Sequence, residues 1–93
     1  MTAKELKELL WSKGWSKTDY NGLGKIAYDN SDKAEDYLFT IWFKKGLHTV
    51  TIEKLSYLAR LRKNDGEKRV PLRLIEVNSN GTALIADGWE IKL

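Results

Sequence analysis

No cysteine occurs among the 93 residues of this chain, and proline, methionine and histidine occur once each. The lack of cysteine excludes disulfide bonds, thiolate metal ligands and a cysteine nucleophile, and it fits a protein of a reducing compartment. A zinc site would have to combine the single imidazole with carboxylates, which is not the usual zinc ligand set. We therefore interpret His48 as a turn or cap residue, and the sequence implies no metal.

Long apolar segments are lacking as well. No run approaches 18 apolar residues, the length from which a membrane-spanning helix is read. No charged and then apolar leader opens the chain, as a secretory signal would. We expect a cytoplasmic protein that does not contact a membrane.

The residues that are present are typical of a folded domain. The chain is 42% apolar and 31% charged, and it has four tryptophans, four tyrosines and two phenylalanines. A chain of this length forms one domain with a thin core, and large rings compensate because each buries about 150–250 Å². We predict a single globular domain over residues 1–93.

Positive charge is concentrated in one stretch. The segment from Lys54 to Arg73 carries seven positive and two negative side chains, a local charge of +5 in a chain whose net charge is +3. Concentrated charge raises a local potential that attracts polyanions. The seven cationic residues are Lys54, Arg60, Arg62, Lys63, Lys68, Arg69 and Arg73.

The first helix has start and stop signals in the sequence. Thr2 and Glu5 are spaced as a capping box, and Gly14 stands where a left-handed residue ends a helix. Leu6 and Leu10 fall on one stripe at helical spacing, which predicts an amphipathic helix on a core. Trp11 and Trp15 lie off that stripe, so we expect both on the outer side of the helix.

Residues 31–46 allow two interpretations. Helix caps and end charges agree at both ends of the segment, with Glu35 and Asp36 near its start and Lys44 and Lys45 near its end, and they favour a helix over residues 34–45. The alternative is a buried strand over residues 37–43 that turns into residues 48–52, because the segment is almost entirely aromatic or β-branched.

Residues 49–63 are similarly ambiguous. Apolar residues at helical spacing, with basic residues in the last turn, favour a third helix. A hairpin that turns at Asp65-Gly66, between residues 57–63 and 69–75, is the alternative.

The other segments have clearer signals. Polar residues and glycines predict a loop over residues 16–24, followed by a short strand over 25–28. Asn80-Gly81 predicts the tip of a hairpin, and Asp87-Gly88 predicts a bend into residues 89–93.

The favoured fold class is therefore α+β, with three helices, a short strand and a C-terminal antiparallel hairpin. This element order resembles the winged-helix arrangement, in which the third helix enters a nucleic-acid groove and the hairpin is the wing. The usual helix-turn-helix residue pattern is absent. The alternative fold is one N-terminal helix with a small antiparallel β-sheet or barrel.

Two further sequence patterns give little support for a cofactor or metal site. Residues 22–27 match the G-x-G-x-x-A spelling of a dinucleotide fingerprint, but no strand precedes them and no helix opens within them, so we interpret the glycines as loop residues. The acidic residues of segment 29–36 do not match a calcium loop. We expect no cofactor and no enzyme activity.

The basic stretch carries the function prediction. We predict a small nucleic-acid-binding domain, of the kind found in transcriptional or phage- and plasmid-type regulators, that contacts phosphates through a basic helix and hairpin. The predicted binding residues are Lys54, Tyr57, Arg60, Arg62, Lys63, Lys68, Arg69 and Arg73, with Tyr57 as a stacking surface. The alternative is a protein-binding module, an inhibitor or adaptor, that uses Trp11 and Trp15 or the basic face against an acidic partner.

Overall fold

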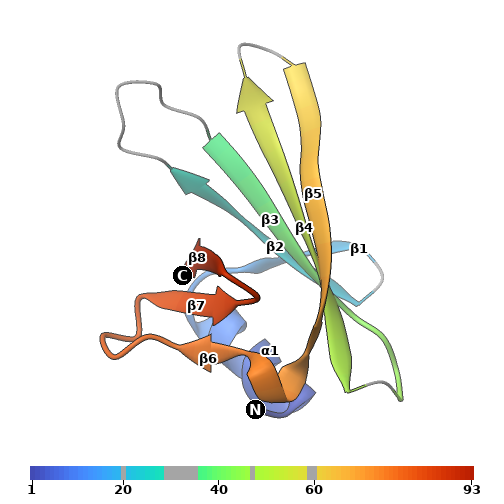
Figure 1. Ribbon diagram of the computed structural model, residues 1–93, viewed down its shortest axis with the longest axis vertical. Coiled ribbons are helices and arrows are strands. Elements are labelled where there is room, and N and C mark those ends of the chain that lie inside the picture. The colour runs from blue at the N-terminus through green and yellow to red at the C-terminus, as the bar shows by residue number, and fades with distance from the viewer. Residues whose placement is uncertain (20, 29–35, 47, 59–60) are drawn as a thin grey trace.

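The computed structural model describes residues 1–19, 21–28, 36–46, 48–58 and 61–93. Within these ranges it describes all side chains except those of residues 19, 27, 28, 36, 57, 58 and 61–63. The described part of the chain forms one α-helix, a short 3-10 helix and eight strands in two antiparallel sheets (Figure 1). The helices are α1 (Ala3–Ser12) and η1 (Leu72–Leu74). The strands are β1 (Ser16–Asp19), β2 (Gly22–Tyr28), β3 (Asp36–Phe43), β4 (Thr49–Leu58), β5 (Leu61–Pro71), β6 (Glu76–Val77), β7 (Ala83–Ala86) and β8 (Trp89–Lys92).

The favoured three-helix prediction, and with it the winged-helix order, is wrong. Strands β3 and β4 occupy the segments predicted as the second and third helices, and they pair in antiparallel register from Asp36↔Tyr57 to Phe43↔Val50. The end charges that favoured helices are worth only about 0.3–1 kcal/mol each. Pairing two apolar, β-branched segments within a sheet outweighs that local preference.

The five strands β1 to β5 form a meander in chain order. The predicted loop over residues 16–24 is wrong, because β1 and the start of β2 occupy it. The pair Asp65-Gly66 is not a hairpin turn but a bulge within β5, since Lys54 pairs with Gly66 while Leu55 pairs with Asn64. The Gly66 amide donates to the Asn64 side-chain oxygen at 2.9 Å, and the Gly66 φ of 150° suits glycine.

The signals at the ends of the first helix are confirmed. The Glu5 amide donates to the Thr2 hydroxyl at 3.1 Å, and that hydroxyl donates in turn to the Glu5 carboxylate at 3.0 Å. Gly14 has a φ of 87° just after the C-cap residue Lys13. The chain therefore leaves α1 in a left-handed turn that leads into β1.

The small sheet has the order β6-β7-β8. The predicted bend at Asp87-Gly88 is confirmed, because it joins β7 to β8 with φ values of 46° and 82°, as a type I′ turn requires. Before β7, Gly81 also has a positive φ of 69°. The Asn78 side chain accepts hydrogen bonds from the amides of Thr82 and Ala83, at 2.8 and 3.1 Å, which holds the preceding turn.

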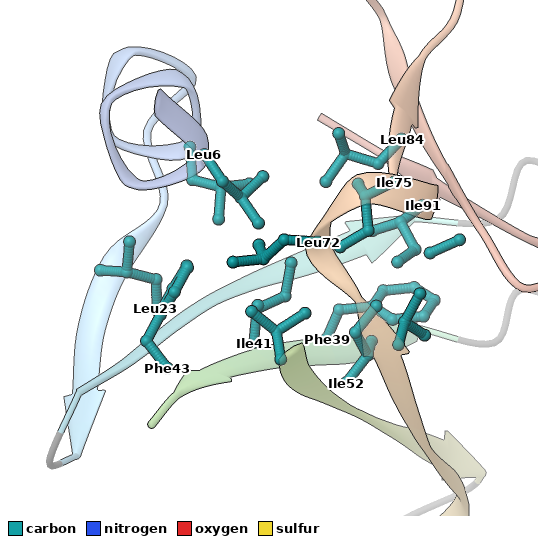
Figure 2. Packing of buried hydrophobic residues seen from close by; sticks show 14 of the residues in the cluster. Leu6, Leu23, Phe39, Ile41, Phe43, Ile52, Leu72, Ile75, Leu84 and Ile91 are labelled. Atoms are coloured by element: carbon teal, nitrogen blue, oxygen red, sulfur yellow. The ribbon is translucent and has the colours of Figure 1, made fainter. Parts of the chain in front are cut away.

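One face of the five-stranded sheet, here called the inner face, forms the core with α1, η1 and the small sheet. Figure 2 shows Leu6 of α1 directed toward Leu72 of η1, with Ile41 of β3 beneath them and Leu84 and Ile91 of the small sheet beside them. The side chains of Leu6, Ile41, Leu84 and Ile91 are completely buried. The described elements other than β1 therefore contribute side chains to one hydrophobic core or pack against it.

Successive side chains of a strand point to opposite faces of a sheet, so every second residue of each strand lies on the opposite face of the five-stranded sheet, here called the outer face. Trp42, Thr51 and Arg69 stand in one row across β3, β4 and β5, and Thr40, Glu53 and Glu67 stand in the next row. On β2 the corresponding positions are Gly22 and Gly24, so this part of the face carries no side chains of its own. The glycines leave room for neighbouring side chains.

Replacement of Gly24 by alanine tests this close packing. A methyl group at Gly24 would lie 2.6 Å from Cγ2 of Thr18 and 3.2 Å from the Phe39 carbonyl oxygen. We expect Gly24→Ala to lower the free energy of unfolding by about 1–3 kcal/mol, the usual cost of overpacking, in urea denaturation. Thr18→Ser removes Cγ2, and the double variant should recover part of the loss. A Gly24→Ala protein as stable as the parent contradicts the described packing.

Candidate functional site

The cationic side chains predicted to form one surface are divided between the two faces of the sheet. Lys54 and Lys68 pair with the inner residues Phe39 and Ile52, and they therefore lie on the inner face. Arg69 lies on the outer face, opposite Thr51, and Arg73 is exposed in η1. The expected single basic surface is not formed by these four residues. The side chains of Tyr57, Arg62 and Lys63, and the whole of Arg60, lie outside the described part of the structure.

Lys68 contacts its own protein. Its ammonium lies 4.7 Å from the centre of the Trp89 ring, donates to the Asp87 carbonyl oxygen, and forms a salt bridge with the Asp87 carboxylate at 3.5 Å. Only 26% of the Lys68 side chain is exposed. The Lys68 charge thus helps hold the β7–β8 turn against the sheet, and it is less available to a ligand than an exposed lysine.

Lys54 is also engaged on the inner face. Its ammonium lies 4.1 Å from the centre of the Tyr37 ring and 6.0 Å from that of Phe39, both within the range of cation–π attraction. The Phe39 ring in turn meets Trp89 edge to face, at 6.3 Å between ring centres. The two inner lysines and these aromatic rings form one packed group beside the small sheet.

The two predicted interface tryptophans have opposite environments. Trp11 is 63% exposed on α1, whereas Trp15 is 2% exposed and belongs to the hydrophobic core. The Trp15 indole nitrogen is buried and has no hydrogen-bond partner among the described residues. The expectation that both lie on the outer side of α1 therefore holds for Trp11 and not for Trp15, because the chain turns at Gly14.

A groove of about 610 Å³ lies on the outer face, where the ends of β3, β4 and β5 meet the β1–β2 turn. This volume is within the range of small-ligand sites. Trp42 supplies its aromatic wall, Thr51 a hydroxyl and Asn21 an amide. Asn21 has a φ of 54° in the turn, and its carbonyl accepts a hydrogen bond from the Phe43 amide at 2.9 Å, which fixes the turn against β3.

The position of Trp42 depends on Gly22. A β-carbon at Gly22 would lie 2.9 and 3.0 Å from two carbons of the indole, so the ring lies directly over this glycine. Trp42 is half-buried, and it lines the groove with part of its surface. Gly22 and Trp42 are paired positions of β2 and β3, so the sheet register places the indole ring over the glycine.

Charged side chains of both signs line the same groove, and none of them forms an ion pair with a described residue. The cations are Lys44, Lys45 and Arg69, and the carboxylates are Glu53 and Glu67, which stand directly opposite each other on β4 and β5. Within the described ranges the single ion pair is Lys68–Asp87, on the other face. Two like charges at paired positions destabilise a sheet. The groove therefore presents five charged groups that have no ion-pair partner among the described residues.

Two other hollows are chemically simpler. One of about 680 Å³ lies beside the start of α1, with His48 and Arg73 at its edge and an otherwise mostly apolar lining that includes Leu72. A smaller one of about 360 Å³ surrounds the exposed Trp11 with Lys7 and Glu8. The outer-face groove differs from both because it gathers three cations and two carboxylates, none in an ion pair with a described residue, around one aromatic ring.

The sequence reasoning missed most of this site. It included Arg69 but assigned Trp42, Lys44 and Lys45 to a predicted helix, so their common face was lost. Gly22 and Gly24, interpreted from the sequence as loop residues, lie within β2. Their spacing of two is the one feature of the sequence that indicates a strand with both glycines on the same face. Pairing of these glycines with a neighbouring strand cannot be inferred from one segment alone.

Comparison of the chain with known protein families, with curated proteins and with solved structures finds no match. In the part of the chain that the structure describes, no helix has the length and apolar character needed to cross a membrane. The same residues contain no group of three or more histidine, aspartate or glutamate side chains arranged to hold a metal ion.

Proposed function

We propose that this protein binds single-stranded nucleic acid in the outer-face groove. The observation that carries the proposal is the convergence on one hollow of about 610 Å³ of a half-buried tryptophan and three cations that form no ion pair with any described residue. Proteins that bind single strands combine a positively charged groove, which follows the backbone, with aromatic rings on which bases stack. The groove has an aromatic ring and three cations, which stand beside two carboxylates.

The residues have separate roles in this proposal. Lys44, Lys45 and Arg69 neutralise phosphates, and Arg69 is suited to two simultaneous bonds because its guanidinium is a planar fork. Trp42 stacks on one base. Asn21 and Thr51 offer hydrogen bonds to the sugar or to the base edge.

A single strand fits this site better than a duplex. A base stacks on the Trp42 ring only if it is unstacked from its neighbours, and single strands offer such bases while a duplex does not. Reading a duplex through its major groove usually requires a helix or a two-stranded ribbon that enters it. The one α-helix of the described residues, α1, has lysines interleaved with Glu5 and Glu8, and it packs against the core instead.

The salt dependence of binding tests the proposal. If three phosphates are neutralised, the logarithm of the affinity for a fluorescent single-stranded seven-mer should fall with log salt at a slope of about −2, from −0.7 per phosphate. Arg69→Gln should make the slope shallower by about 0.7. Trp42→Leu should weaken binding by about 1–3 kcal/mol at an unchanged slope. Fluorescence anisotropy at several salt concentrations measures both effects.

Two lysine variants are matched controls. Lys92→Gln removes an exposed cation of the small sheet and should leave the slope unchanged. Lys68→Met removes the cation at Trp89 and should lower the melting temperature without changing the slope. No binding of the parent protein at low salt contradicts the proposal, and so does an equal loss of slope in Arg69→Gln and Lys92→Gln.

A protein-binding module is the second candidate, and the 63% exposure of Trp11 favours it. Exposed tryptophans are enriched among residues that dominate protein interfaces. Trp11→Ala should abolish capture of a partner protein by the immobilised chain while leaving the melting temperature unchanged, because the ring makes little contact with the core. Capture that survives Trp11→Ala removes this candidate.

A further inference from the structure

The two glutamates of the groove have no role in holding phosphate, and they would repel it. Glu53 lies on the strand next to Trp42, one row farther along the outer face. Such diagonal positions on paired strands are about 7–8 Å apart, a distance that long side chains can span. Glu53 is half-buried, whereas Glu67 on the edge strand β5 is exposed. Neither carboxylate has an ion-pair partner among the described residues. The Trp42 ring lies over Gly22 on β2, and Glu53 lies on β4, but both side chains line the groove, so a base that stacks on the ring must extend across β3 to place an edge at the Glu53 carboxylate.

An ionised carboxylate only accepts hydrogen bonds, and it has two oxygen atoms with which to do so. Among the four bases, guanine alone presents two adjacent donors on its pairing edge, the N1–H and the 2-amino group. Adenine and cytosine place a donor beside an acceptor, and thymine or uracil places one donor between two acceptors. An acceptor of these bases would face the carboxylate and be left unpaired, at a cost in affinity.

We propose that the groove selects guanine, with Trp42 stacking on the base and Glu53 accepting its N1–H and 2-amino hydrogens. The inference rests on the proposed nucleic-acid function and identifies the base that the same site prefers. Lys44, Lys45 and Arg69 then hold the phosphates on either side of that base. Glu67, farther from the ring, contributes negative charge to the groove and does not contact the base.

Seven-mers that differ at one base test the selection. The probes are thymidine seven-mers whose central base is guanine, adenine, cytosine, thymine or hypoxanthine, which is guanine without the 2-amino group. The guanine probe should bind about tenfold more tightly than those with adenine, cytosine or thymine, the effect of hydrogen bonds to a charged acceptor. The hypoxanthine probe, with one of the two donors, should fall between them.

Three variants separate recognition of the base from general electrostatics. Glu53→Gln should abolish the preference for guanine and tighten binding of the all-thymidine probe, because a negative charge near the phosphates is lost. Glu67→Gln should tighten binding of every probe and keep their order. Glu90→Gln, in the small sheet, should change neither the order nor the affinity. Melting temperatures establish that each variant is folded.

The outcomes distinguish the two proposals. If no probe binds at low salt, the proposed function and the guanine inference both fail. If all five probes bind equally, or if Glu53→Gln keeps the preference, the guanine inference alone is overturned. Parallel titrations with guanosine monophosphate and with the ribose form of the guanine probe show which source of guanine binds best, a free nucleotide, DNA or RNA.

Discussion

Burial of the inner face of the five-stranded sheet is the constraint on which the rest of the structure depends. An antiparallel sheet is stable when one face is covered, and here α1, η1 and the small sheet cover it together. Leu6, Leu72 and Leu84 come from three of these elements, yet they meet in one core (Figure 2). In the described part of the chain these covering elements lie on the inner face, and the groove lined by Trp42, Glu53 and Arg69 lies on the opposite face.

The same constraint explains how the charges are distributed. On the inner face, Lys54 and Lys68 place their ammonium groups beside aromatic rings. On the outer face, Glu53, Glu67 and Arg69 form no ion pair with any described residue. Arg69 is one residue from Lys68 in the chain, yet it lies in the groove and has no ion pair within the described ranges. The four cations of the basic stretch whose side chains are described are therefore divided between different faces of the fold.

The sequence predicted well where a signal was local. The Thr2 cap, the Gly14 helix end and the Asp87-Gly88 turn each depend on a few neighbouring residues, and each is observed. It predicted poorly where pairing decides the structure. The helix signals over residues 31–46 were consistent with one another, but β3 forms because its apolar residues meet those of β2 and β4, which are distant in sequence. The candidate site depends on the same pairing, because Trp42, Glu53 and Arg69 come from three strands.

We propose that ligand binds the outer face while the inner face forms the hydrophobic core. Chemical-shift mapping of the ¹⁵N-labelled protein during titration with the guanine-centred seven-mer locates the bound surface. We expect the largest changes at the amides of Asn21, Trp42, Lys45, Glu53 and Arg69, with little change in α1 and β6–β8. Changes concentrated on α1 around Trp11, or on the small sheet, would contradict it.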